Sequence, residues 1–524
     1  MASAAPASPS EPAPAHLVDQ AERLRRQMVL AVVMMGSFMA VLDITIVNVV
    51  IPEIMASFGV NVKEVKWVST AFLIAQAVVM PSTGWLGRRL GLGRLYFLEL
   101  LVFTAGSALC AMAWSLEMLV FARVLQAIGG GGIMTTSLSI ITDTFPPGER
   151  GRAMGIWGVG FMVGSASGPT LGGLLSEWFN WRAVFFVNLP IGVLALMFTT
   201  VALQRGQQDT RSPFHWRGYL ALSAFLIVGL LTVEYGQDEG WDAGLIRLGM
   251  AGTAVFFALF LLLNWGSPHP LLPLRLFRSR DFTMVMLISV VRSIPMFAPL
   301  FMVPLFLQNV QGRDTITTGL LLIPSAVTQM VCMPLVGSLT DRYGPRWITV
   351  IGVFLCANCM YLFSYMDPVA GIWPAIYPQF WRGVGISILF SSVNTAGLNA
   401  VPARDAGTCS WMLSLLMYTG GSVAIALLGT WLQSSTLSQM DLLGTGALLH
   451  GALPPELLDR ARGLGYGVFE AEAAARGVLL GHVADVAVAR AYSDRFVQMA
   501  LWTMAAVVPA WFISSGRAGA RRAA

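Results

Sequence analysis

The sequence predicts an all-α integral membrane protein with fourteen transmembrane helices. Of its 524 residues, 56% are hydrophobic and only 12% are charged, whereas soluble domains carry about twice that charged share. A helix needs roughly 20 apolar residues to cross a bilayer, and fourteen stretches come close to that length. These stretches are residues 29–50, 67–87, 95–114, 118–141, 153–174, 184–203, 217–235, 245–265, 282–308, 318–339, 347–366, 372–396, 406–432 and 496–513.

The basic residues test this count independently, because Lys and Arg prefer cytoplasmic loops. With the N-terminus inside, the inner segments hold twenty of the 33 Lys and Arg residues, and the short outer loops hold five. This asymmetry supports fourteen spans with both termini in the cytoplasm. The net charge of +5 is therefore interpreted as a topology signal, and we expect no nucleic-acid partner.

The spans are expected to form two groups of six around two inserted helices. GWLGRRLGLGR, which begins at Gly84, and GSLTDRYGPR, which begins at Gly337, share Gly, Leu, Arg and Gly in register after equivalent spans. Internal similarity of this kind is typical of transporters built from repeats. The expected organisation is a disordered cytoplasmic tail over 1–27, a six-helix bundle over 28–205, two inserted transmembrane helices with linkers over 206–281, and a second six-helix bundle over 282–524.

The second bundle includes one long outer segment, residues 433–495, before its last helix. The Ala, Glu, Arg and Leu content of this segment predicts one or two amphipathic helices. Three roles stay open for them: contact with the membrane surface, contact with a partner, or a cover over the outer opening.

Asp43 in the first span and Arg123 in the fourth are the central candidates for proton coupling. A charged residue inside a span is costly, so it faces a cavity or a partner of opposite charge and marks an ion or proton route. Both residues lie roughly 10 Å below the outer surface at 1.5 Å per residue. Burial favours the neutral form of the acid, and a nearby guanidinium favours the charged form. A pair that forms and breaks would move a proton, whereas an acid bonded to backbone would stay neutral.

Two further bases are predicted near the middle of their spans. With Arg123, Arg292 and Arg382 make three buried bases against one buried acid, because Glu99 and Glu234 are interpreted as lying nearer span ends. A cavity with this balance becomes electropositive when its acid is protonated, which favours neutral or anionic amphiphiles. Backbone carbonyls and amide side chains are the alternative partners for these bases. The residues expected to line the cavity are Asn48, Gln126, Arg292 and Arg382.

The fifth span carries glycines at every fourth position and one proline. Such a stripe lets a neighbouring helix approach closely, and the proline favours a bend. We interpret the stripe as a hinge between the two bundles. Its residues are Gly160, Gly164, Gly168, Pro169, Gly172 and Gly173.

Several segments match the motifs of one family. LDITIVNVVIP (Leu42 to Pro52), RVLQAIGGGG (Arg123 to Gly132) and GSASGPTLGG (Gly164 to Gly173) are similar to its first-, fourth- and fifth-helix motifs. WRAVFFVNLPIG and WPAIYPQFWRG match two later segments. The chain resembles the major facilitator superfamily, in the fourteen-span EmrB/QacA-like group of drug:proton antiporters, over nearly its whole length.

This resemblance implies the superfamily fold and export of small amphiphilic substrates by alternating access. It implies no cofactor, because the proton gradient is the energy source. It also implies a multi-pass protein of the bacterial cytoplasmic (inner) membrane. In a host with two membranes, it implies a periplasmic adaptor similar to EmrA and an outer-membrane channel.

The inner-loop motif departs from the superfamily pattern in its first copy. Arg88 stands where the pattern has an acid, while the second copy keeps Asp341. If this acid latches the cytoplasmic side shut by capping a helix end, the latch lies mainly in the second half. Helix C-termini beside the basic pair of the first copy are the alternative latch, and a role in topology alone is the other interpretation. The motif residues are Gly84, Arg88, Arg89, Gly91, Gly337, Asp341, Arg342 and Gly344.

No enzyme or metal site is predicted. No HExxH, nucleophile elbow or Walker loop is present, and the five histidines, His16, His215, His269, His450 and His482, lie outside the predicted spans. A channel or receptor stays open on span count alone, but repeated halves favour alternating access. Two functions remain: multidrug or amphiphile efflux, and dedicated export of a lipid, siderophore or secondary metabolite, which could be anionic.

Overall fold

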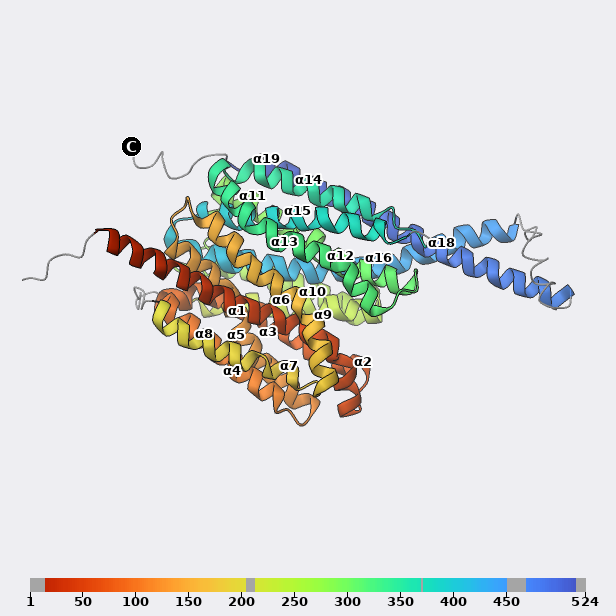
Figure 1. Cartoon of the computed structure of the whole chain (residues 1–524), viewed down its shortest axis with the longest axis horizontal. Coiled ribbons are helices and arrows are strands. Elements are labelled where there is room, and N and C mark those ends of the chain that lie inside the picture. Colours follow the sequence, from red (N-terminus) through yellow and green to blue (C-terminus); the bar gives the residue numbers. More distant parts are fainter. Residues whose placement is uncertain (1–14, 204–212, 369–370, 450–467, 515–524) are drawn as a thin grey trace, which may run out of the picture.

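The computed structural model describes residues 15–203, 213–368, 371–449 and 468–514. Figure 1 shows long helices that run side by side along one axis. The described residues contain no strand, which confirms the all-α class. Eleven helices in this part of the chain are long and apolar enough to cross a membrane. All fourteen predicted spans fall on helical segments, although the exact number of spans stays a prediction.

The first half of the chain forms one group of helices. α1 packs against α6, α4 packs against α5 and α8, and α3 packs against α5. The sixth predicted span consists of α7 and α8, which meet at Val187. The elements are α1 (Ala15–Phe58), α2 (Val62–Val65), α3 (Trp67–Leu90), α4 (Leu92–Ala111), α5 (Leu116–Thr144), α6 (Arg150–Trp178), α7 (Ala183–Phe186) and α8 (Asn188–Ala202).

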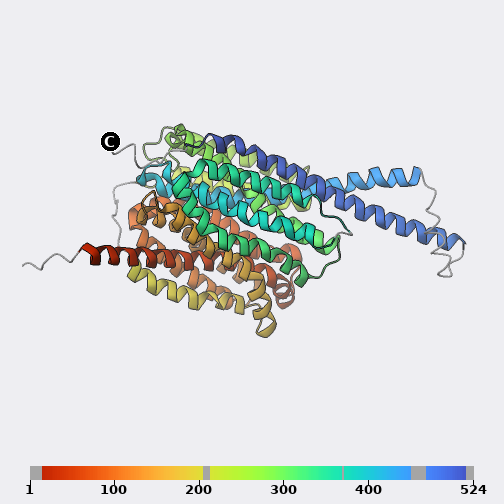
Figure 2. The same cartoon turned by 45° about the horizontal axis from the view of Figure 1, so that its top comes forward.

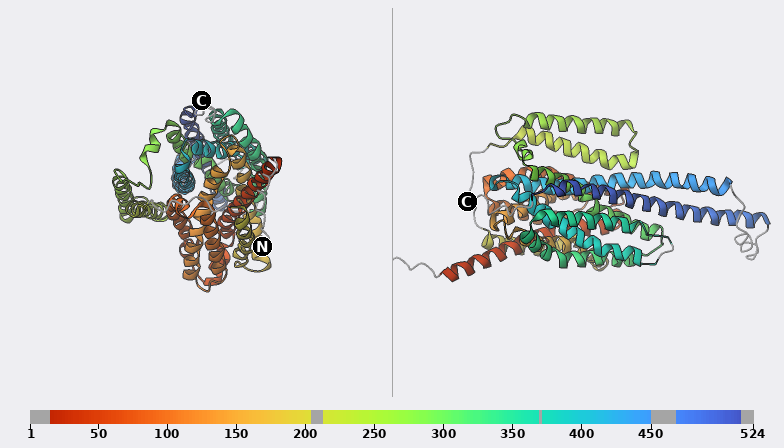
Figure 3. Two further views of the ribbon diagram at one scale, coloured as in Figure 1. Left: turned by 90° about the vertical axis from the view of Figure 1, so that its left-hand side faces the viewer. Right: turned by 90° about the horizontal axis from the view of Figure 1, so that it is seen from above.

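The two inserted helices are α9 (Trp216–Glu239) and α10 (Gly244–Asn264). The right-hand view of Figure 3 shows them as a pair along one side of the bundle. α9 contacts both α3 and α16, so the pair covers a seam between the two halves. The Tyr219 hydroxyl donates to the Val78 carbonyl at 3.1 Å, and the Trp241 indole donates to the Thr430 hydroxyl at 2.9 Å.

The second half repeats the arrangement of the first. α13 packs against α15, α14 against α15 and α18, and α12 against α16. The seventh of the twelve bundle spans consists of α11 and α12, which meet at Arg292. The elements are η1 (Leu274–Arg278), α11 (Arg280–Val291), α12 (Ser293–Asn309), α13 (Thr315–Tyr343), α14 (Pro345–Phe363), α15 (Trp373–Asn399), η2 (Ala403–Asp405), α16 (Ala406–Leu449), α18 (Val468–Ala505) and α19 (Val507–Trp511).

The predicted outer segment 433–495 is not a separate loop. α16 continues through it to Leu449, and α18 begins at Val468. Figures 1 and 2 show both helices projecting well beyond the rest of the bundle. The helical content of this segment was therefore predicted correctly. The loss of apolar residues after residue 432 shows where the predicted span ends, but α16 itself continues beyond that point. Residues 450–467 lie outside the described part of the chain.

The predicted disordered tail is wrong for residues 15–27. α1 already begins at Ala15, and residues 1–14 lie outside the described chain. The segment AERLRRQ consists of strong helix formers, and Glu22 pairs with Arg26 one turn later at 2.7 Å. These residues extend the first transmembrane helix towards the left-hand end of the bundle in Figure 1. We call this end the terminal end, and the opposite end the far end.

The two copies of the inner-loop motif have the same backbone conformation. Gly91 ends α3 and precedes α4 with φ 83°, and Gly344 ends α13 and precedes α14 with φ 83°. Glycine adopts a positive φ at little cost, while other residues are strained there. This shared turn gives a physical reason for the glycine in both copies and agrees with a duplicated fold.

The two halves meet near the terminal end. A Cβ added to Gly151 of α6 would lie 2.5 Å from the carbonyl oxygen of Gly337 in α13, so the two backbones touch. Trp157 of α6 stacks on Phe390 of α15 with ring centroids 5.4 Å apart. Further contacts across this seam join Gly84 to Gly407, Ser139 to Ser410, and Arg150 to Asn399. The structure is therefore closed at the terminal end.

The glycine stripe that is predicted to act as a hinge packs within the first half. The glycine stripe of α6 faces α1, within the first half: Gly164 lies against the backbone of Phe38, and Gly172 against Ile46. The contact with the second half uses the glycines at the beginning of α6 instead. Four-residue spacing predicted close helix packing correctly, but it does not identify the neighbouring helix.

Valine at Gly164 should lower the stability of the protein. Its Cβ would lie 2.6 Å from the Phe38 carbonyl oxygen, and overpacking of this kind costs about 1–3 kcal/mol. Gly173→Val is the matched control, because nothing lies within 4 Å of a Cβ at Gly173. Thermal melts of the two purified variants followed by size-exclusion chromatography test this. Equal melting temperatures would contradict the close packing of α1 and α6.

Candidate functional site

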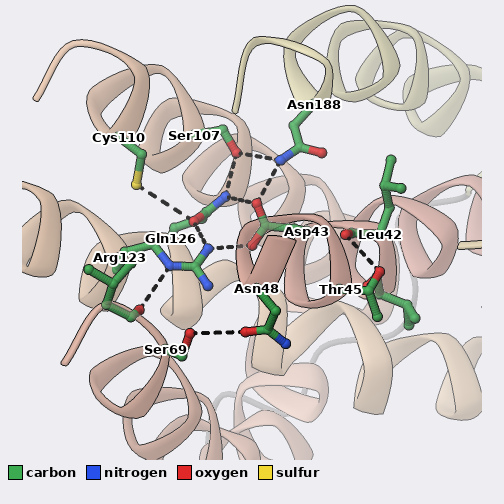
Figure 4. Close-up of polar contacts among 12 residues, drawn as sticks. Leu42, Asp43, Thr45, Asn48, Ser69, Ser107, Cys110, Arg123, Gln126 and Asn188 are labelled. Atoms are coloured by element: carbon green, nitrogen blue, oxygen red, sulfur yellow. Dashed lines mark hydrogen bonds and ion pairs between the residues drawn. The ribbon is translucent and has the colours of Figure 1, made fainter. Parts of the chain in front are cut away.

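Asp43 lies in the middle of α1 and is completely buried. One carboxylate oxygen, Oδ2, accepts a hydrogen bond from Nη1 of Arg123 at 2.5 Å. The other, Oδ1, accepts from the amides of Gln126 and Asn188, each at 2.8 Å. Figure 4 shows these side chains converging from α5 and α8 on the acid. Both oxygens are thus satisfied by strong donors.

Arg123 is held in place by more than the acid. Its Nε donates to the Val68 carbonyl of α3 at 3.2 Å, and its Nη1 also donates to Gln126 at 2.7 Å. Its guanidinium carbon lies 4.0 Å from the centre of the Phe72 ring. A buried ion pair is stable only with such additional bonds, because desolvation opposes the attraction between the charges. Arg123 can therefore keep its position when the charge of the acid changes.

Ser107 of α4 links the two amides. Its hydroxyl accepts from Gln126 at 2.6 Å and from Asn188 at 3.3 Å. The network therefore joins α1, α4, α5 and α8 around one carboxylate. Protonation of the acid would change the bonding of every member, because a protonated carboxyl is also a donor.

A second acid joins the two halves at the terminal end. Asp341, near the end of α13, accepts from the backbone N–H of Gly151 through Oδ1 and of Arg152 through Oδ2, both at 2.8 Å. These N–H groups begin α6, where the helix dipole favours a negative charge. Asp341 thus occupies the capping position of a helix in the other half, as the latch interpretation expects.

In each copy of the inner-loop motif, one arginine lies over an aromatic ring. Arg89 lies over the Trp85 ring at 5.4 Å, and Arg342 of the second copy lies over Tyr343 at 5.4 Å. Gly84 of the first copy packs on the backbone of Gly407 in the other half. The first copy therefore contributes a close backbone contact to the terminal seam, and the second copy contributes the acid.

Comparison with known proteins identifies the family. A family model described as Major Facilitator Superfamily matches residues 33–426. The chain belongs to this superfamily. The multidrug resistance protein B homolog of Mycobacterium tuberculosis (strain ATCC 25618 / H37Rv) is 29% identical over 94% of this chain and 91% of its own length. Multidrug export protein EmrB of Escherichia coli (strain K12) is 28% identical over 78% of this chain and 80% of its own.

A solved structure confirms the superfamily fold. The proton:xylose symporter XylE has a TM-score of 0.58 and 13% sequence identity, with 92% of this chain and 95% of that chain covered. The relatives above, with the family model, confirm the EmrB/QacA-like group predicted from the motifs. The protein is thus a multi-pass membrane member of a family of transporters.

The structure of this superfamily member brings Asp43 and Arg123 together, as their equal depth predicted. Gln126, expected to line a substrate cavity, binds Asp43 and Arg123 instead. Asn48 is exposed on α1 and accepts from the Ser69 hydroxyl at 3.2 Å, apart from the acid (Figure 4).

Two members of the network, Asn188 and Ser107, were not predicted from the sequence. Asn188 stands in the segment WRAVFFVNLPIG, so a polar residue inside a matched motif was the available signal. Ser107 lies among small residues of α4 and gives no sequence signal, because serine is common in such helix contacts.

Glu99 is a second buried acid, so the predicted balance of one buried acid against three buried bases is wrong. Glu99 is 6% exposed, on the buried face of α4, and its Oε1 accepts from the Thr136 hydroxyl at 2.8 Å. Gly132 of α5 provides the space, because a Cβ there would overlap the Glu99 carboxyl. The acid therefore depends on a glycine in the adjacent RVLQAIGGGG segment, which its distance from the end of the span could not reveal.

Proposed function

We propose that this superfamily member is a proton-coupled efflux transporter that exports drugs and other amphiphiles by alternating access. The observation that carries the proposal is the buried Asp43–Arg123 pair, in which a single protonatable group is held by three donors from two other helices, α5 and α8. The names of the two relatives, a multidrug resistance protein and a multidrug export protein, support the substrate class.

In the proposed cycle, a proton from the outer side neutralises Asp43. The charge-assisted bond to Arg123 weakens, because such bonds are about twice as strong as neutral ones. The amides of Gln126 and Asn188 then face a neutral acid, and α1, α5 and α8 can shift. The seam at the terminal end, including the cap that Asp341 forms on α6, opens. Substrate enters from the cytoplasm or the inner leaflet, and the proton leaves to the cytoplasm.

The proposed location is the cytoplasmic membrane of a bacterium. The distribution of Lys and Arg supports an inner position for both termini, which makes the terminal end cytoplasmic and the far end external. In a host with two membranes, we propose an adaptor similar to EmrA and an outer-membrane channel as partners. The projecting parts of α16 and α18 would then lie on the adaptor side.

One observation favours a second function, dedicated export of an anionic lipid, siderophore or secondary metabolite. The second half buries Arg292 and Arg382, and no ion pair of either residue with an acid is found in the described chain. A buried cation in this half suits a substrate with an acidic group.

The proposal is tested in proteoliposomes with an imposed pH gradient. We expect dye transport that saturates, follows the direction of the gradient and stops when a protonophore dissipates it. Transport that continues unchanged without a gradient would indicate a channel or uniporter and would contradict the proposal. Liposomes without protein control for passive dye movement.

A further inference from the structure

We propose that Arg292 forms an oxyanion-binding subsite, which holds a carboxylate, sulfonate or phosphate group of the exported amphiphile. The inference rests on the proposed export function and narrows its substrate class. It places the substrate anion in the second half of the molecule, apart from the protonatable Asp43 in the first half.

Arg292 joins α11 to α12 with helical backbone angles, so the two helices form one long helical segment. It caps α11 at its C-terminal end, where its N–H donates to Ile288 at 2.8 Å, and it precedes the first residue of α12. The Arg292 side chain is only 4% exposed, so its charge lies inside the protein.

The guanidinium of Arg292 is largely without partners. Nη2 donates to the Asn394 amide oxygen of α15 at 3.2 Å, while Nε and Nη1 have no acceptor in the described chain. An arginine keeps its charge in proteins, and a buried charge without a counter-charge is costly. An anion at this position would supply both the missing charge and the missing acceptors.

The other two buried arginines differ from Arg292. Arg123 has its own acid, and its Nε and Nη1 both donate. Arg382 donates to the Ser325 hydroxyl at 2.9 Å and to the Met296 carbonyl at 3.0 Å, which leaves only its Nε without an acceptor. Among the three, Arg292 is therefore the one with the most donors left without an acceptor in the described chain.

The face of α11 that carries Arg292 also offers a hydroxyl. Ser289 lies one helical turn earlier, on the same face, and its buried hydroxyl has no partner in the described chain. Val285, one further turn away, contacts Gly397 of α15, which shows that this face packs towards α15. The Arg292 guanidinium and the Ser289 hydroxyl therefore offer donors, with no acid between them, that suit an oxyanion. Charge-assisted and bidentate hydrogen bonds from arginine to an oxyanion are stronger than hydrogen bonds between neutral groups.

The subsite is tested by binding of two dyes that share a xanthene ring system, anionic fluorescein and cationic rhodamine 123. Fluorescence anisotropy measures their affinity for the full-length protein in detergent. We expect Arg292→Gln to weaken fluorescein binding by about tenfold or more, as for loss of a charge-assisted pair, and to leave rhodamine 123 binding unchanged. Arg292→Lys should weaken it less, because lysine keeps the charge but not the planar fork.

Arg382→Gln is the matched control, since it also removes a buried positive charge from the second half. An equal loss of fluorescein affinity in both variants would indicate a general potential and overturn the subsite. Unchanged fluorescein affinity in Arg292→Gln would overturn it as well. If Arg292→Gln does not fold, the comparison of Arg292→Lys with Arg382→Lys decides in the same way.

Transport separates this inference from the proposed function. If Arg292→Gln exports rhodamine 123 along the proton gradient but loses fluorescein export, both stand. If the wild-type protein binds fluorescein through Arg292 but transports neither dye along the gradient, the proposed function fails and the subsite remains. If export follows the gradient and the variant keeps its preference for fluorescein, the subsite fails alone.

Discussion

Asparagine in place of Asp43 is expected to abolish gradient-driven export and to leave the protein folded in the membrane. Asparagine has nearly the same shape and still offers a carbonyl oxygen to Arg123, but it cannot bind or release a proton. Arg123 keeps its bonds to Val68 and Gln126 and its contact with Phe72. Loss of the ion pair lowers the melting temperature, because the remaining charge is less well compensated.

The Asp43→Asn variant is measured in the proteoliposome assay together with Glu53→Gln. Glu53 is an acid of the same helix, but it binds Ser176 and takes no part in the network around Asp43. The Glu53 variant should therefore export dye at the wild-type rate, while the Asp43 variant shows only exchange that is independent of the gradient. Uphill export by Asp43→Asn at the wild-type rate would show that the proton binds elsewhere.

The sequence was sufficient to predict the pair of Asp43 and Arg123 but not the network around it. A charged residue is so unfavourable in lipid that its depth and the depth of its partner can be read from the spans alone. Amides and hydroxyls carry no such penalty. Gln126 was therefore assigned to a substrate cavity, and Asn188 was not selected at all, although its amide is as close to the acid as that of Gln126.

The sequence also did not predict which helices pack together or where each helix ends, for a different physical reason. A glycine stripe shows that a helix approaches closely, but α1 and α13 both contact α6, at different parts of its length. Hydropathy marks where lipid ends, whereas a helix continues as long as its residues favour it, as α16 does to Leu449. The repeated motif gave the strongest information, because Gly91 and Gly344 impose the same turn in both halves.

Valine at Gly151 is expected to prevent the terminal end from closing and to stop transport. A Cβ at this position would lie 2.5 Å from the Gly337 carbonyl oxygen and 2.7 Å from Oδ1 of Asp341. Separation of the two halves relieves both clashes, so the substitution destabilises only the closed state. An overpacking cost of about 1–3 kcal/mol corresponds to a shift of roughly 5–150-fold in the equilibrium between the two states.

The closed state is measured by disulfide formation between cysteines that replace Ser139 and Ser410, whose hydroxyl oxygens are 3.1 Å apart across the seam. The cross-link should form readily in the otherwise wild-type protein and slowly when Gly151→Val is added. Gly173→Val, on the same helix but with open space around its Cβ, should leave both cross-linking and dye export unchanged. Rapid cross-linking in the Gly151 variant would mean that the seam can close around a larger side chain, and the backbone contact would then not control access from the terminal end.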